Sequence, residues 1–346
     1  MADNDRKNEL RFVFRIIWLL FLFCVIESGC GAHKNIAHPA SIIYAQWEQL
    51  DDMPRPLGRY SLACDGSCIY MLGGVRHNIR SGQAYMRSFT EYNPSKQLWR
   101  KLASAPFGTG YASLSYWPDK ERIVAIAGIR RLGDDFDTEG ITVGIYDRSQ
   151  DTWEVKKYEC PGLGLVKLLI HCRKGRFLVL TRKNKTALLD LDRDTFRLTG
   201  TYPNKGRNLG KAKTDNTLYV LTGGWRKPAA LHSFDLHNYR YKRSINLKGE
   251  FQAIDCLFSW QNRLFIWKNS GPYDRKNPYS YSSVLLQVNP DTGAATELRD
   301  GFKGARSRRS SSGMMLGDSF YIFGGQRRDT VWLKDVHRCR LILKDK

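Results

Sequence analysis

The sequence lacks the short motifs that mark several common kinds of enzyme. It contains no GxSxG turn, no HExxH zinc motif, no phosphate-binding P-loop and no pair of CxxC motifs. These absences exclude the standard signatures of serine hydrolases, zinc proteases, P-loop nucleotide hydrolases and four-cysteine zinc sites. We assign no catalytic residue from sequence, so the function has to be inferred from how the chain is organised.

Metal ligands are also scarce, because the chain has only seven histidines. His232 and His237 are five residues apart, which places them on opposite faces of a strand and makes them a poor metal pair. His171 and Cys172 fall in an expected inner strand, where we interpret them as packed core residues. We therefore expect no metal site and no cofactor.

Acidic residues are few relative to basic ones. The 346 residues include 55 Lys and Arg against 34 Asp and Glu, which gives a formal net charge of +21. This excess favours an anionic partner, whether a glycan, a nucleic acid, an acidic peptide or a membrane surface. The chain has 42% hydrophobic residues, with 17 Tyr, 16 Phe and 9 Trp. It can therefore bury a substantial core, and its aromatic residues favour strands.

No hydrophobic run is long enough for an ordinary membrane-spanning helix. The apolar segment IIWLLFLFCVI at 16–26 is about half of the roughly 20 residues that such a helix needs. Basic residues precede it and the small residues of 28–32 follow, which is typical of a secretory signal peptide. A retained signal anchor is the main alternative, and a lipoprotein box at ESGC (27–30) or a buried helix are weaker ones. We assign residues 1–32 to this segment and expect a secreted or extracytoplasmic protein, held to a membrane, if at all, only by this segment.

Export would allow the cysteines to pair. Cys64 and Cys68 flank the sequence DGS and can bridge a tight hairpin, whereas buried thiols in strands are an equally good interpretation. The six cysteines beyond the N-terminal segment allow 15 complete pairings, so the connectivity stays open: Cys64, Cys68, Cys160, Cys172, Cys256 and Cys339. Asn184 begins a glycosylation sequon, which has meaning in a secreted eukaryotic protein.

An apolar strand that ends in a pair of small residues recurs along the chain. Four copies are clear (IYMLGG, IVAIAGI, YVLTGG and FYIFGG), and two are degenerate (FLVLTR and LFIWKN). The six copies start at Ile69, Ile123, Phe177, Tyr219, Leu264 and Phe320. A further strand precedes each copy, joined in the first by Asp65-Gly66, and a strand–turn–strand segment such as TEYNPSKQLWRKL follows. The pattern predicts six units of four short antiparallel strands, without helices.

Units of about 50 residues with four strands and a Gly pair resemble kelch repeats. The resemblance covers 47–346 and implies an all-β, six-bladed kelch-type β-propeller. The third and fifth units depart from the pattern, with Thr181-Arg182 and Lys268-Asn269 in place of the small pair. The last unit lacks an outer strand, and SIIYAQWEQLDDMP is a lone strand near the N-terminus. We therefore predict that this N-terminal strand closes the last blade, that 33–46 hold a linker and the start of that strand, and that the propeller is a monomer.

In the kelch architecture, the loop after each Gly pair lies on the same face as the loop that enters each blade. All six units carry at least two basic residues in the first of these loops, whereas the turns on the other face are neutral to acidic. Aromatic residues such as Tyr85 and Trp332 lie in or beside the same loops. Because arginine binds carboxylate and phosphate through a planar fork of donors, we predict a basic ligand-binding ring formed by Arg59, Arg76, Arg130, Arg131, Arg182, Arg207, Arg226, Arg327 and Arg328, together with Trp225.

Two functions fit this organisation. The first is a binding module without enzymatic activity, whose basic face takes an acidic protein segment or an anionic glycan; kelch propellers of ubiquitin-ligase adaptors bind acidic peptides in this way. The second is a carbohydrate enzyme, because the chain also resembles the exported sialic acid mutarotases, which are lone six-bladed kelch propellers. A copper enzyme like the kelch-type galactose oxidases is disfavoured, and nucleic acid is a lesser choice of partner for an exported protein.

Overall fold

The computed structural model describes residues 42–75, 85–128, 140–181, 183–203, 207–224, 227–249, 253–270, 282–298, 308–309, 312–327 and 332–344. The chain divides into two compact units, residues 1–42 with 344–346 and residues 43–343. Apart from the end residues of β1 and β25, the second unit holds all the strands. Across the described ranges the single helical element is a short 3-10 turn at Pro118–Lys120. No helix in those ranges is long and apolar enough to cross a membrane.

The strands form six antiparallel sheets, and in five of them the strand order follows the chain. The first two sheets consist of β2 (Gly58–Cys64), β3 (Ile69–Val75), β4 (Phe89–Asn93) and β5 (Leu98–Leu102), then β6 (Ser113–Trp117), β7 (Arg122–Ile126), β8 (Gly140–Asp147) and β9 (Thr152–Glu159). The third consists of β10 (Val166–Arg173), β11 (Arg176–Thr181), β12 (Lys185–Asp190) and β13 (Thr195–Thr201). The fourth and fifth consist of β14 (Arg207–Thr214), β15 (Thr217–Gly224), β16 (Lys227–Asp235) and β17 (Tyr241–Asn246), then β18 (Ala253–Trp260), β19 (Arg263–Ser270), β20 (Ser282–Val288) and β21 (Ala295–Glu297).

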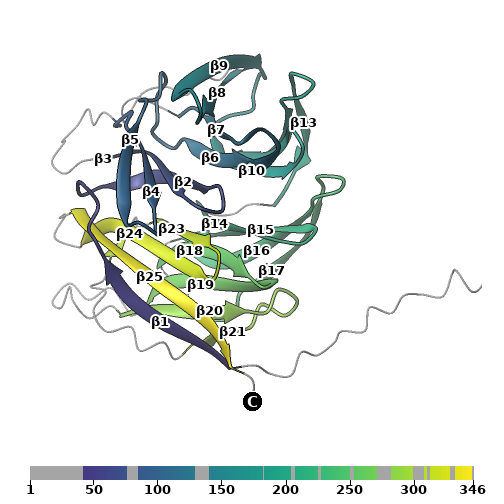
Figure 1. Cartoon of the computed structure of the whole chain (residues 1–346). Helices are drawn as coiled ribbons and strands as arrows, with labels where there is room; N and C mark the ends of the chain where they lie inside the picture. The colour runs from purple at the N-terminus through teal and green to yellow at the C-terminus, as the bar shows by residue number, and fades with distance from the viewer. Residues whose placement is uncertain are drawn as a thin grey trace, which may run out of the picture. The chain divides into compact units, whose positions relative to one another are not determined.

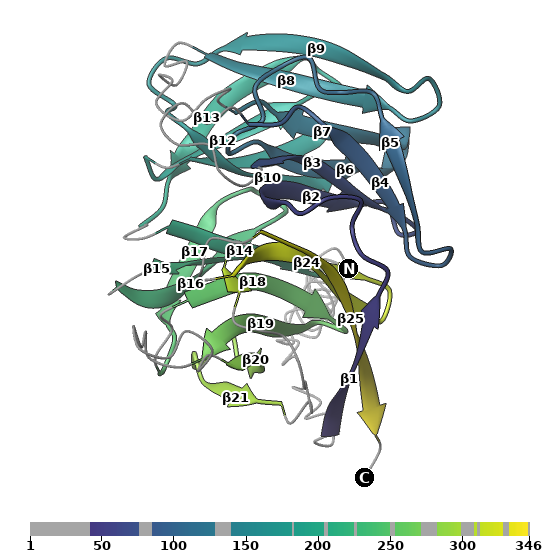
Figure 2. The same cartoon turned by 90° about the vertical axis from the view of Figure 1, so that its left-hand side faces the viewer.

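The sixth sheet uses both ends of the chain. Its strands are β22 (Arg308–Arg309) and β23 (Ser312–Leu316), which both pair with β24 (Ser319–Arg327), then β25 (Trp332–Lys344) and finally β1 (Ile42–Leu50). Figures 1 and 2 show β1 and β25 lying side by side. The predicted closure of the last blade by the N-terminal strand is therefore confirmed.

The six sheets are arranged as the blades of a propeller, and the apolar core lies between the blades. Each of six large apolar clusters combines residues of two neighbouring blades, including the pair formed by the sixth and first blades. In that pair, the rings of Tyr92 and Phe323 meet edge to face with their centroids 5.8 Å apart. One cluster for every neighbouring pair means that the circle of blades is closed. The predicted six-bladed, four-stranded architecture is confirmed.

The recurring apolar strand is the second strand of each blade, as predicted. It corresponds to β3, β7, β11, β15, β19 and β24. In the first and last blades the Gly pair that ends it has positive φ, at 78° and 106° for Gly73 and Gly74 and at 37° and 106° for Gly324 and Gly325. L-residues rarely adopt this conformation, which explains why glycine is used there. A Cβ on Gly324 would also come within 2.7 Å of the Leu333 carbonyl oxygen.

The turn between the third and fourth strands of a blade is a second structural feature that repeats along the chain. An Asn or Asp begins it and accepts backbone N–H groups two or three residues ahead, as Asp147 does from Ser149 and Gln150. Four residues after the Asn or Asp, five blades have a residue with left-handed φ: Gln97 (51°), Asp151 (52°), Asp194 (54°), Tyr239 (61°) and Gly293 (69°). These Asx turns explain the polar segments seen in the sequence.

The six cysteines beyond the N-terminal segment form no disulfide with one another. Cys64 and Cys68 flank the β2–β3 turn as free thiols, so the suggested bridge across this hairpin is absent. Burial raises the pKa of Cys64 to about 11. The structure supports the interpretation as packed thiols: five of the six are buried and Cys64 is partly buried, with Cys68 and Cys160 next to strands and the other four within them.

Candidate functional site

The inner strands of the blades all begin at one end of the propeller, which we call the entry face. Because the second strand of a blade runs antiparallel to the first, its last residues lie beside the first strand's first residues. Gly58 pairs with Val75 in the first blade, Arg207 with Gly223 in the fourth, and Arg308 with Arg327 in the sixth. The loops that enter the blades and the loops after the Gly pairs therefore share this face.

Most of the predicted basic ring lies outside the described residues. This applies to Arg76, Arg130, Arg131, Trp225, Arg182, Arg226 and Arg328. Arg207 and Arg327 are placed by their backbones alone, at the entry-face ends of β14 and β24. Arg59, the second residue of β2, is the one member whose side chain is described, and it is exposed. The ring as a whole stays a prediction.

Around Arg59 the structure brings together a small aromatic and basic group, which we call the entry cluster: Arg59, Tyr85, Tyr111 and Lys167. The rings of Tyr85 and Tyr111 lie with centroids 5.9 Å apart. Lys167 Nζ lies 4.7 Å from the centroid of the Tyr111 ring, within the range of a cation–π contact. The ring of Tyr111 is 42% exposed. Three blades thus contribute to one patch.

The backbone at the entry cluster has an unusual conformation. Arg59 and Tyr111 have φ values of 58° and 60°, in the left-handed region that costs non-glycine residues energy. Nearby glycines, which have no side chain, allow buried aromatic rings to pack directly against the backbone. A Cβ on Gly110 would lie 2.3 Å from Cδ2 of Tyr85, and one on Gly58 would lie 1.9 Å from Cζ3 of Trp332. The close approach of ring to backbone fixes the position of Tyr85.

The Tyr85 hydroxyl is the least satisfied group of the cluster. Tyr85 is only 5% exposed, and its hydroxyl has no hydrogen-bond partner of good geometry among the residues that the structure describes. Burial raises the pKa of Tyr85, as does the neighbouring Tyr111, whereas Arg59 lowers it. Tyr111 and Arg59 are close enough to affect this pKa through side-chain hydrogen bonding, but neither contact has good geometry, so a ligand group that accepts from the Tyr85 hydroxyl gains affinity.

Tyr111 and Lys167 were missed by sequence reasoning. Each stands at the start of an inner strand, after a glycine-rich loop (FGTG and GLGL). Those loops are the one sequence signal that could have pointed to them, because they recur just before inner strands. Tyr85 was expected to lie beside the entry-face loops, and it does so.

The inner strands are joined by side chains that reach the neighbouring backbone. Ser113 and Ser115 of the second blade each accept a backbone N–H of the third blade at 2.9 Å. Lys211 of the fourth blade donates from Nζ to the carbonyl oxygens of Leu114 (3.2 Å) and Leu169 (2.5 Å). Burial lowers the pKa of Lys211 to about 8. These contacts fix the innermost strands to one another.

Of the four histidines in the described ranges, His171, His232 and His337 have partners within the propeller, the last through its Nε2, 2.8 Å from Asp335 Oδ2, and His237 is exposed. His232 is buried in β16, where its Nε2 lies 2.8 Å from Thr222 Oγ1 and its Nδ1 lies 3.0 Å from Ser244 Oγ. His237 is exposed in the following turn, and His171 lies in the inner strand β10, where its Nε2 bonds to the carbonyl of Lys174. Within the described ranges no group of three or more His, Cys, Asp or Glu residues could hold a metal ion.

Comparison with known proteins identifies the fold and leaves the family open. No protein-family model matches the chain, and no curated protein matches it. A solved structure described as "Structure of YjhT" is similar, with a TM-score of 0.59 and 11% sequence identity over 86% of this chain and 99% of that chain. The chain is a six-bladed β-propeller. Because 1171 solved chains resemble it in structure, the likeness indicates the fold and does not select a function.

Proposed function

We propose that this protein is a non-enzymatic binding propeller whose entry face holds an anionic glycan. The observation that carries the proposal is the buried Tyr85 hydroxyl, which lies between Arg59 and Tyr111 and has no partner of good geometry among the described residues. An anionic ligand that accepts from this hydroxyl and pairs with Arg59 satisfies both groups. The net charge of +21 favours the approach of such a ligand.

The exposed ring of Tyr111 favours a glycan over an acidic protein segment. A flat aromatic face beside a cation suits a sugar ring that stacks on the aromatic while its carboxylate or sulfate meets the arginine. We extend the proposed binding surface to the basic ring defined above, which the repeat pattern predicts for the same face of the blades. Binding of an acidic peptide instead is one outcome of the experiment below.

The proposal includes a location and a family. The basic N-terminal start, the short apolar core and the small residues that follow support export or membrane anchoring by residues 1–32. The Gly pairs with positive φ and the spacing of the units support a kelch-type repeat. Determining the N-terminal residue of the mature protein tests the location: a mature chain that begins at Met1 and remains in the cytoplasm would contradict it.

A sugar mutarotase is the alternative, supported by the predicted basic ring and by the six-bladed propeller fold. A mutarotase must move protons between ring oxygen and hydroxyl, for which His, Asp or Glu side chains are usual. The entry cluster contains none of these, so we favour binding alone. Incubation with sialic acid, followed by NMR of the two anomers, distinguishes the binding module from the mutarotase. Interconversion of the anomers faster than in buffer would establish the enzyme.

The binding proposal is tested on a panel of anionic glycans and acidic peptides. We expect retention of carboxylated or sulfated glycans, and a loss of about tenfold in affinity for Arg59→Gln, because charge-assisted hydrogen bonds contribute 1.5–3 kcal/mol. Tyr111→Ala should weaken the same glycans. Arg197→Gln, an exposed arginine in β13 away from the entry face, is the matched control. Equal retention by all variants would overturn the proposal, as would binding to acidic peptides only.

A further inference from the structure

A second candidate site lies at the opposite end of the strands from the entry face. There, an open groove of about 690 Å³ lies between the outer strands of the first blade and the turns of the second. This volume is in the range of small-ligand sites. Five cationic side chains line the groove, Lys96, Arg100, Lys120, Arg122 and Arg148, against three acidic ones. Two carboxylates outside the lining, Asp65 and Glu154, also contact Arg148 and Arg122, so the charges in and around the groove balance.

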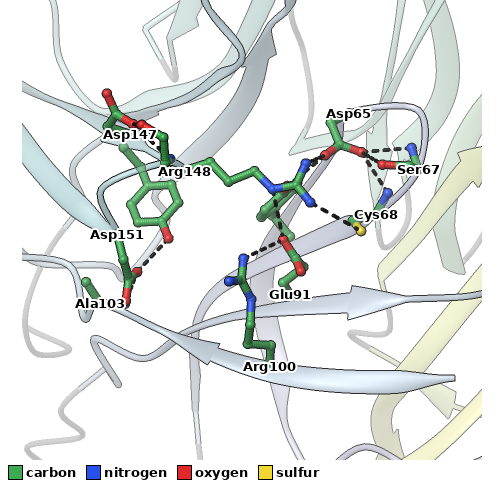
Figure 3. A network of polar contacts seen from close by, with 12 residues as sticks. Asp65, Ser67, Cys68, Glu91, Arg100, Ala103, Asp147, Arg148 and Asp151 are labelled. Atoms are coloured by element: carbon green, nitrogen blue, oxygen red, sulfur yellow. Dashed lines mark hydrogen bonds and ion pairs between the residues drawn. The ribbon is translucent and has the colours of Figure 1, made fainter. Parts of the chain in front are cut away.

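Two carboxylates of the groove, Glu91 and Asp147, are paired with arginines, and Figure 3 shows Glu91 between Arg100 and Arg148. Glu91, with a side chain 9% exposed, accepts from Arg100 Nη2 at 3.1 Å and lies 3.4 Å from Arg148 Nε. The side chains of Arg100 and Arg148 are 52% and 42% exposed. Asp147 holds Arg122 in the same way, with Oδ2 at 2.9 Å from Nη2. Glu91 and Asp147 are thus more buried than the arginines they hold, whereas the third carboxylate, Glu121, is exposed.

This arrangement positions the arginines for a ligand. A guanidinium has five N–H donors, and Arg100 uses one of them on Glu91 in the described contacts. The carboxylate fixes the plane of the guanidinium, so less side-chain freedom is lost when an oxyanion binds to the remaining donors. Asp65 lies behind Arg148, at 2.9 Å from Nη1, and takes no part in the lining. The groove therefore offers pre-oriented guanidinium donors that face solvent.

We propose that this groove binds the phosphate group of a small phosphorylated ligand. A phosphate monoester carries about −1.5 to −2 charges at pH 7 and three acceptor oxygens, which suit the solvent-facing, forked donors of Arg100 and Arg122. A carboxylate or a sulfate ester carries one negative charge, so its charge-assisted hydrogen bonds to the same donors should be weaker. The groove is separate from the entry cluster in sequence and in position, so this site does not depend on the glycan proposal.

Calorimetric titration of the full chain with glucose 6-phosphate, glucose 6-sulfate and glucose tests the site. We expect binding of the phosphate ester, weaker binding of the sulfate ester and none of glucose. The double variant Arg100→Gln/Arg122→Gln should weaken the phosphate ester at least tenfold, and Arg197→Gln should leave it unchanged. Affinity for glucose 6-phosphate should also fall below pH 6, where the monoester takes up a proton.

A second double variant tests the site even if the Arg100→Gln/Arg122→Gln protein fails to fold. Lys96→Gln/Lys120→Gln removes two charges from the groove without touching the pairs with Glu91 and Asp147, and it should weaken the phosphate ester several-fold. The proposal is overturned if the wild type does not bind glucose 6-phosphate at 10 mM. It is also overturned if folded variants of either kind bind it as tightly as the wild type, or if glucose 6-sulfate binds equally well.

Discussion

The guanidinium of Arg148, in the turn between β8 and β9, lies 2.9 Å from the carboxylate of Asp65, in the turn between β2 and β3. This ion pair joins the second blade to the first. Asp65 is almost fully buried, and it also accepts from the backbone of Ser67 and Cys68 and from the Tyr70 hydroxyl (Figure 3). Burial by itself would raise the pKa of Asp65, but these hydrogen bonds outweigh it and lower the pKa.

We expect Arg148→Gln to destabilise the fold by about 2 kcal/mol, because it leaves the buried carboxylate of Asp65 without its guanidinium partner and leaves Glu91 paired with Arg100 alone. Urea denaturation at pH 7 measures this change. Arg197→Gln, which removes an exposed arginine of β13, should change stability by less than about 0.5 kcal/mol. Equal effects of the two substitutions would show that the Arg148 contacts contribute nothing to stability.

His232 should make the protein sensitive to mild acid. Burial lowers its pKa to about 4, below the unfolded value near 6.5. The unfolded chain therefore takes up a proton first, and stability falls as pH drops through the interval between these values. The expected loss between pH 7.5 and pH 5 is about 2 kcal/mol. His232→Gln stays neutral at both pH values, so the difference between its two urea midpoints should be smaller than the wild-type difference; an equal difference would assign the acid sensitivity to other groups.

Lys211 should make the stability of the protein depend on pH in the alkaline range. Its folded pKa of about 8 lies below the ordinary value of 10.5, so the folded protein releases this proton before the unfolded chain does. Stability should consequently rise by about 1 kcal/mol between pH 7 and pH 9. Lys211→Met has no amine to titrate and should lose this rise, which thermal denaturation at the two pH values can measure. A rise of the same size in the variant would contradict the assignment.

Tyr85→Phe should have opposite effects on stability and on binding. Removing a buried hydroxyl that lacks a good partner should stabilise the unliganded protein by about 1 kcal/mol, because the ring keeps its packing against Gly110. The same change should weaken anionic glycans that accept from the hydroxyl. Thermal denaturation without ligand and glycan binding are measured on the same preparation. A loss of stability without ligand would mean that the hydroxyl already has a partner.

The architecture could be predicted from sequence because its signals are local. The Gly pairs, the Asx turns and the strand alternation each depend on fewer than about ten adjacent residues. The regular spacing of the units predicted the third blade correctly although this unit lacks the pair of small residues. There, Asn184 adopts a φ of 62° and donates its N–H to the carbonyl of Thr181, so a turn still follows the second strand without a Gly pair.

The sites could not be predicted in the same way, because they depend on contacts between blades. Tyr111 and Lys167 belong to different blades, and the packing of the second blade on the third brings Lys167 to the Tyr111 ring. The groove likewise joins Arg100 of the first blade to Arg148 of the second through Glu91. Neither pair is adjacent in sequence, and neither has a spacing that a repeat pattern would reveal.

The sharing of one blade between β1 and β25 also determines when the fold can be completed during synthesis. The ion pair between Arg338 and Glu48 joins residues 290 positions apart. Contacts of such long range form late and slowly. A nascent chain can therefore form five blades while the apolar surface around Tyr92, which the sixth blade covers in the folded protein, is still exposed. The propeller closes only after the last strand has left the ribosome. Until then the unpaired N-terminal strand can pair with the last strand of another copy. We therefore expect strand-exchanged dimers to be the characteristic misfolded product at high expression.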